Sequence, residues 1–181
     1  ILIGQQLMKW IYQQESKPTE PLDNLLTYVV IGVIVGARLG HCFFYDPDYY
    51  LSFPLKIFAI WEGGLASHGG FIGMMVALLL YVKKYQLSFV WLLDRLVICT
   101  ALFGVFVRCA NFINSEIIGK PTGTDWGVVF ARIDDIARHP AQLYEAIGYA
   151  ITFSILFSYY RKNKANSQNG MLIALAFILS S

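Results

Sequence analysis

The segment from Arg108 to Gly119 places a permanent cation, two carboxamides and a carboxylate directly after a long apolar run. If that run continues as a helix, Arg108, Asn111 and Ser115 share one face by the three-and-four spacing and form an inward-facing polar stripe. Polar and ionised groups at the edge of hydrocarbon are costly, so a function is the default explanation for them. The alternative for Arg108 is a side chain at an ordinary helix end that extends its charged head toward water.

Two further side chains near the ends of apolar runs suit particular chemistry. Arg38, like Arg108, offers a forked set of donors that matches phosphate oxygens, and a phospholipid headgroup is the phosphate expected at that depth. His68 is the best candidate for proton transfer, because imidazole titrates near neutral pH. The alternative for His68 is a histidine that is hydrogen-bonded in a helix contact.

Other polar and small residues have structural and functional readings of similar weight. Gly69 and Gly70 follow His68 and would let other groups approach it closely, yet small residues also serve helix packing in membranes. Glu145 is expected to share a helix face with Arg138 and Gln142. A structural ion pair with an arginine is therefore as well supported for Glu145 as a catalytic carboxylate.

The composition excludes several classes of protein. In a chain of 181 residues that is 56% hydrophobic, 15% aromatic and 14% charged, apolar side chains far outnumber the groups that solvate a surface, which is typical of a membrane protein. The net charge of +2 gives no case for nucleic-acid binding. Cys42, Cys99 and Cys109 lack the spacing of a zinc site or a disulfide framework. We expect buried thiols, and neither a metal nor a cofactor.

The apolar runs predict an all-α polytopic membrane protein. Complete spans are expected at residues 25–45, 63–82, 87–107 and 139–160, and partial spans at 1–11 and 170–181. The chain would then hold about five to six membrane helices, two of them partial. We expect one transmembrane catalytic domain over residues 1–181, truncated at both ends. Adjacent Asp94 and Arg95 are expected to pair with each other or with a neighbouring helix.

The short basic loops predict an orientation. Lys83 and Lys84 end one span, and Arg161, Lys162 and Lys164 end another on the same side if the spans alternate. That side should be cytoplasmic by the positive-inside rule. The polar candidates of four helices then all lie at the outer leaflet, which favours one shared site there.

Four segments resemble, in order, the motifs of bacterial phosphatidylglycerol:prolipoprotein diacylglyceryl transferases. The signature motif is an arginine followed by Asn-Phe-x-Asn-x-Glu-x-x-Gly, and the resemblance covers nearly the whole chain from Leu25 onward. The matching segments are Gly36 to Gly40, Trp61 to Gly70, Arg108 to Gly119 and Arg138 to Glu145.

The resemblance implies an enzyme of the bacterial inner membrane with about seven membrane helices in the full protein and an active site toward the periplasm. Such an enzyme moves the diacylglyceryl group of phosphatidylglycerol to the lipobox cysteine of a prolipoprotein signal peptide, leaving a thioether and releasing glycerol phosphate. His68 would act as the base or orient the headgroup, and Arg108 would contact the phosphate. The other site residues implied are Arg38, Gly69, Gly70, Asn111, Asn114, Glu116, Gly119, Gln142, Tyr144 and Glu145.

The sequence also departs from the family pattern. Val107 and Ala110 stand where glycine is common, which leaves less room for a lipid against this helix. The family's motifs in its first and last helices lie outside this sequence, so we expect a fragment of the full enzyme.

Two other functions compete with this interpretation. A non-catalytic lipid-binding or transport protein with an anion site in the outer leaflet would need ionisable groups near the midplane for transport. The central parts of three of the expected spans are almost purely apolar, which argues against such a polar route. An intramembrane protease or acyltransferase would need a nucleophile beside a base, for which adjacent Ser67 and His68 are a weak signal.

Overall fold

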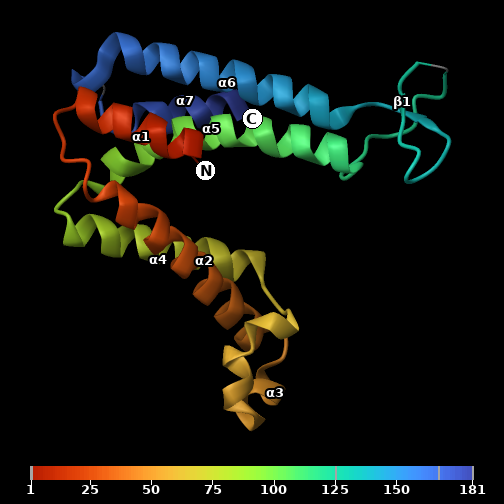
Figure 1. Ribbon diagram of the computed structural model, residues 1–181, viewed down its shortest axis with the longest axis horizontal. Coiled ribbons are helices and arrows are strands. Elements are labelled where there is room, and N and C mark those ends of the chain that lie inside the picture. Colours follow the sequence, from red (N-terminus) through yellow and green to blue (C-terminus); the bar gives the residue numbers. More distant parts are fainter. Residues whose placement is uncertain (1, 125, 167, 181) are drawn as a thin grey trace. The chain divides into compact units, whose positions relative to one another are not determined.

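The computed structural model describes residues 2–124, 126–166 and 168–180 and divides into two compact units. Unit 1 comprises residues 1–16 and 93–181, and unit 2 comprises residues 17–92 (Figure 1). The elements in chain order are α1 (Leu2–Gln14), α2 (Leu22–Phe44), α3 (Pro47–Ser52), η1 (Pro54–Phe58), η2 (Ile60–Glu62), α4 (Ser67–Lys84), α5 (Phe89–Asn114), β1 (Val128–Val129), β2 (Ala137–Arg138), α6 (Ala141–Asn163), η3 (Lys164–Asn166) and α7 (Met171–Ser180).

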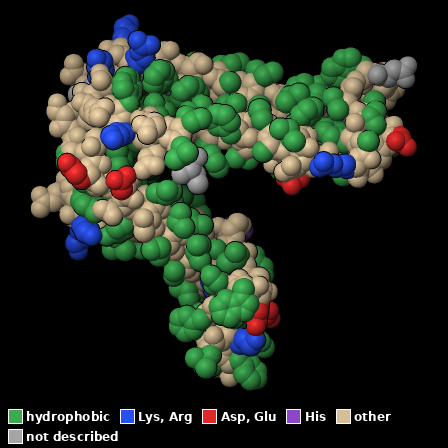
Figure 2. Space-filling model, in the orientation of Figure 1, with side chains coloured by type: hydrophobic (Ala, Val, Ile, Leu, Met, Phe, Trp, Pro, Cys, Tyr) green, Lys and Arg blue, Asp and Glu red, His purple; other side chains and the backbone are tan. Residues whose placement is uncertain are grey.

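Most of the described residues are helical, as the apolar runs predict. Among them, α2 and α5 are long and apolar enough to cross a membrane. Figure 2 shows hydrophobic side chains over much of the visible surface of each unit. Apolar surface on this scale is unfavourable in water, whereas lipid tails solvate it. The fold is that of a helical membrane protein.

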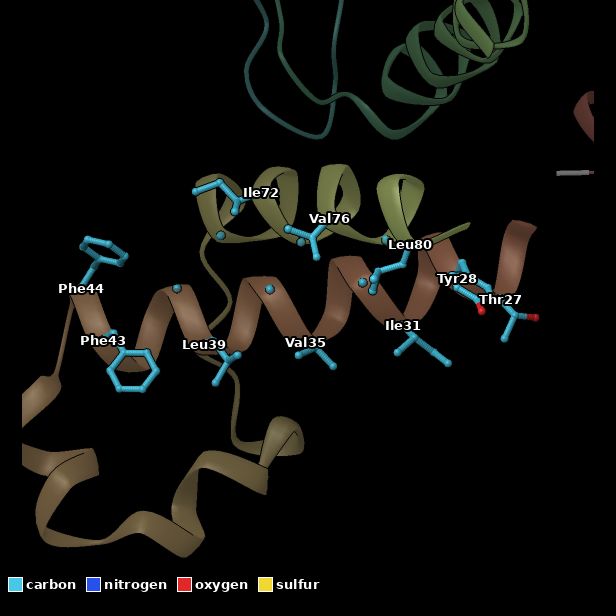
Figure 3. A pocket seen from close by; sticks show the side chains of 16 residues that line it. Thr27, Tyr28, Ile31, Val35, Leu39, Phe43, Phe44, Ile72, Val76 and Leu80 are labelled. Carbon is cyan, nitrogen blue, oxygen red and sulfur yellow. The ribbon is translucent and has the colours of Figure 1, made fainter. Parts of the chain in front are cut away.

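The main contact in unit 2 is the close approach of α2 and α4 through glycines. A methyl group at Gly32 would lie 2.5 Å from Ala77 Cβ, and one at Gly40 would lie 2.7 Å from Gly69 Cα. At Gly36 it would collide with the Gly69 carbonyl oxygen. Beside this contact lies an apolar groove, where Ile31, Val35 and Leu39 project from α2 and Ile72, Val76 and Leu80 project from α4 (Figure 3). The glycines pack the two backbones together, as is common in membranes.

Buried charged groups join the helices of unit 1. Arg95 of α5 pairs with Asp94 at 2.9 Å and with Glu15 at 3.0 Å, and all three side chains are at most 5% exposed. Tyr160 of α6 donates a hydrogen bond to Glu15 at 3.0 Å. Asp94 Oδ1 also accepts the backbone N–H of Ile173 in the first turn of α7 at 3.0 Å, which satisfies one of the helix's free amide groups. The expected pairing of Asp94 and Arg95 is confirmed, both with each other and with neighbouring elements.

A small hairpin lies between α5 and α6. Antiparallel β1 and β2 pair Val128 with Arg138 and Val129 with Ala137. Arg138 also binds Asp134 at 2.5 Å, and this hydrogen bond lowers the pKa of the Asp134 carboxyl below its ordinary value. These two short strands are an exception to the expected all-α fold.

Three local predictions are wrong. Ser115 lies outside α5 and has a left-handed backbone with φ 60°, so it does not continue the stripe of Arg108 and Asn111. The expected span beginning at Gly63 becomes helical at Ser67, because Gly63 and Gly64 have positive φ angles. Arg138 lies in a strand before α6 and therefore shares no helix face with Glu145.

Candidate functional site

Arg108 and Glu145 form the central ion pair of unit 1. Arg108 lies near the end of α5 and Glu145 in the second turn of α6, and Arg108 Nε lies 2.5 Å from Glu145 Oε2. The two side chains are 24% and 45% exposed. Among the described residues, none accepts a hydrogen bond from the Nη atoms of Arg108. The pair therefore holds one edge of the guanidinium and leaves its other edge able to bind an anion.

This ion pair lies on the wall of a groove formed by three helices of unit 1. The cavity is about 640 Å³, within the usual range of small-molecule sites. Apart from the ion pair, the lining is mainly apolar. The lining residues are Val97, Thr100, Ala101 and Arg108 from α5, Glu145, Gly148, Tyr149 and Thr152 from α6, and Ile173, Ala176, Phe177 and Leu179 from α7. An apolar groove with a cation on its wall suits an amphiphile with an anionic head.

The polar residues after Arg108 stabilise the chain reversal at the end of α5. Glu116 N donates to the Asn111 carbonyl at 2.8 Å. In the amide orientation that satisfies both acceptors, Asn111 Nδ2 donates to Val107 O and Glu116 Oε2 at 3.3 Å each. Gln142 Nε2 donates to Glu116 O at 2.7 Å and so ties the turn to α6. Asn114 and the Glu116 side chain are exposed.

Gly119 and Tyr144 have different surroundings. A methyl group at Gly119 would collide with the His139 carbonyl oxygen, so glycine is needed for this close backbone contact. Arg138 Nη1 also donates to Gly119 O at 3.4 Å, which holds the same two backbone segments together. Tyr144 is 46% exposed, and its hydroxyl lies 3.4 Å from His139 Nδ1.

Arg38 of unit 2 is buried and bound to backbone. Its side chain donates to the carbonyls of Ile57 at 2.9 Å, Lys56 at 2.6 Å and Gly64 at 3.2 Å, and also to that of Gly63. The residue is only 3% exposed. Four carbonyl acceptors occupy most of the guanidinium donors. Arg38 therefore fastens the segment of residues 56–64 to α2.

His68 lies in the first turn of α4, directly after that segment. Ala66 N donates to Ala37 O at 2.9 Å, which fixes the start of the helix against α2. The His68 side chain is exposed, and no hydrogen bond to its ring is found among the residues that the structure describes. Gly69 lies in the α2–α4 contact, and a methyl group at Gly70 would lie 3.4 Å from Ala37 Cβ.

The structure thus places the candidates in two groups. Unit 1 holds Arg108, Asn111, Asn114, Glu116, Gly119, Gln142, Tyr144 and Glu145, and unit 2 holds Arg38, His68, Gly69 and Gly70. Sequence reasoning did not single out Gly148, Tyr149 and Thr152 of the groove. These residues follow Glu145 by three, four and seven positions, so they lie near the same helix face. This spacing is the signal that could have identified them.

The fold defines a class, that of helical membrane proteins, and the groove suits an amphiphile. The model of the family described as prolipoprotein diacylglyceryl transferase matches residues 1–181, and the chain belongs to this family.

Curated relatives agree with this assignment. Phosphatidylglycerol–prolipoprotein diacylglyceryl transferase of Tolumonas auensis is 54% identical over 179 residues, covering 98% of this chain and 69% of the relative. The proteins of the same name from Chloroherpeton thalassium and Porphyromonas gingivalis are 44% and 40% identical and cover 95% and 97% of this chain. The chain spans 65% and 66% of those two relatives, or about two thirds of their length.

Proposed function

We propose that the protein transfers the diacylglyceryl group of phosphatidylglycerol to the lipobox cysteine thiol of prolipoproteins. Family membership over residues 1–181 supports this activity. The structural observation that carries the proposal is Arg108, which lines a mainly apolar groove and pairs with Glu145 through Nε, so that its Nη atoms have no acceptor among the described residues.

The reaction needs a nucleophile and a stabilised leaving group. The substrate thiol loses its proton, and the thiolate attacks the glyceride carbon that carries the phosphate ester. A carbon–sulfur bond forms, the carbon–oxygen bond to phosphate breaks, and glycerol phosphate leaves with the bonding electrons. Arg108 stabilises the negative charge on the departing phosphate, and its fixed position in apolar surroundings strengthens this effect.

We propose that His68 accepts the proton of the substrate thiol. Its imidazole is exposed, and imidazole is the side-chain base generally suited to proton transfer near neutral pH. The backbone contacts of Arg38 and Ala66 hold the start of α4 and so orient this residue. Orientation of the headgroup, with the proton going elsewhere, is the competing role for His68.

We further propose that the full-length protein spans the bacterial inner membrane with about seven helices. The purely basic ends of α4 and α6 support a cytoplasmic location for those ends. The ends of α5 and α2 that carry Arg108 and Arg38 then face the periplasm. A prolipoprotein whose signal peptide crosses the same membrane would present its cysteine at that face.

Arg108→Lys in the full-length protein tests the phosphate role. The charge is kept while forked donation is lost, so we expect transfer to fall at least about a hundredfold. The measurement is transfer from labelled phosphatidylglycerol to a synthetic lipobox peptide. Normal turnover by this variant would contradict the proposal.

The same assay separates the two roles of His68. If it is the base, His68→Ala should lower kcat about a hundredfold or more and change the pH–rate profile. A variant with nearly normal kcat and a raised KM for phosphatidylglycerol would leave only the orienting role.

A further inference from the structure

The groove of α5, α6 and α7 has the length of one lipid leaflet. From Val97 to Arg108 the helix advances eleven residues, or about 16 Å at 1.5 Å per residue. Half of a typical hydrocarbon core is about 15 Å. A lipid whose anionic head is bound at Arg108 could therefore extend one hydrocarbon chain along the groove.

The groove wall away from Arg108 is mainly apolar. The Thr100 hydroxyl donates a hydrogen bond to Leu96 O at 2.9 Å. This polar group is therefore already satisfied within the helix. Ala101 of α5 and Ala176 of α7 line the same space. The hydroxyl groups of Tyr149 and Thr152 also belong to the lining, but most of the wall is apolar and suits a hydrocarbon chain.

Gly148 provides open space in this wall. It lies on α6 one turn after Glu145, and a methyl group added there would meet no atom within 4 Å. Its φ angle is not positive, so other residues can take its backbone conformation without strain. A larger side chain at position 148 would enter the groove instead of disturbing the helix.

We propose that this groove holds one acyl chain of the donor lipid and that the open space at Gly148 sets how large a chain the groove accommodates. The proposal rests on the proposed function, since it takes the lipid head to be bound at Arg108. Gly148 is then a specificity-determining residue, and the substrate class is a diacyl anionic glycerophospholipid with long chains.

The experiment compares Gly148→Leu and wild type in the full-length protein with dioctanoyl- and dipalmitoyl-phosphatidylglycerol. We expect the ratio of kcat/KM for the long-chain lipid to that for the short-chain lipid to fall about tenfold, as when a hydrophobic pocket is partly filled. Gly148→Ala should lower the ratio less. Ile147→Phe is the matched control, because Ile147 is 60% exposed on the same helix and does not line the groove.

A second measurement is needed because the substitution could act through folding. Thermal unfolding of each variant should show no loss of stability, since leucine and alanine are better helix formers than glycine. An unchanged ratio, or an equal loss for both lipids, would overturn the proposal. So would a large loss of thermal stability in Gly148→Leu, which would show that protein fills the groove.

The outcomes also separate this proposal from the proposed function. If Arg108→Lys abolishes transfer while the chain-length ratio of Gly148→Leu is that of wild type, the function stands and the groove assignment fails. If wild type transfers neither lipid to the lipobox peptide, the function itself fails.

Discussion

Two arginines of this protein carry the same charge in opposite surroundings. Arg38 is 3% exposed and donates to four backbone carbonyls, so its donors serve the chain itself. Arg108 is partly exposed and shares only its Nε edge with Glu145. A guanidinium that stabilises a leaving group needs free donors where charge develops. By this criterion we propose that Arg108 stabilises the leaving group and that Arg38 holds the segment of residues 56–64 in position.

We predict that Arg38→Lys loosens the segment of residues 56–64. An ammonium cannot donate to four carbonyls at once as the planar guanidinium does, and each hydrogen bond lost costs about 0.5–1.5 kcal/mol. Limited proteolysis should then cleave this segment about tenfold faster or more. Arg132→Lys is the control, because Arg132 is an exposed arginine outside this segment. Equal protection in Arg38→Lys and wild type would show that the four hydrogen bonds do not hold the segment.

At the scale of elements, close backbone contact between α2 and α4 leaves no room for side chains at the crossing. The positions concerned repeat every fourth residue on α2, at Gly32, Gly36 and Gly40. The opposing surface of α4 presents Gly69 and Gly73. Dispersion between tightly packed backbones is the main attraction available to helices in lipid, so this crossing defines the core of unit 2.

We predict that Gly36→Ala destabilises the protein by about 1–3 kcal/mol, because the new methyl group would meet the backbone of α4, which cannot move aside cheaply. The measurement is thermal or denaturant unfolding in detergent. Gly4→Ala is the matched control, since a methyl group there meets nothing within 4 Å. A stability of Gly36→Ala equal to that of Gly4→Ala would contradict the crossing as described.

At the scale of the whole molecule, we expect the loop after α5 and the loop after α6 to face opposite sides of the membrane. In a variant without native cysteines, Thr124→Cys should react with an impermeant maleimide in right-side-out vesicles. Asn166→Cys should react only after the vesicles are opened, since basic loops stay in the cytoplasm. Both positions are exposed. The reverse pattern of labelling would invert the proposed orientation.

Much of the fold was predictable because length and apolar composition determine where membrane helices form. Pairing of Asp94 with Arg95 follows from their adjacency, and the pairing of Glu145 with an arginine was one of two open alternatives. The carbonyl contacts of Arg38 were not predictable, because they depend on how an irregular segment folds back on α2. The left-handed conformation at Ser115 was missed because only the following turn, and not the residue type, requires it.

The bond between Asp94 and the Ile173 amide also bears on how the protein is made. Asp94 is fully buried, and α7 comes last among the described helices. Until α7 arrives from the ribosome, one carboxylate oxygen of Asp94 lacks this donor. The groove that includes Arg108 is also missing a wall at that stage, because α7 supplies Ile173, Ala176, Phe177 and Leu179 to it. This donor to the Asp94 carboxylate and this wall of the groove therefore both depend on α7, so a chain interrupted before α7 lacks both of them.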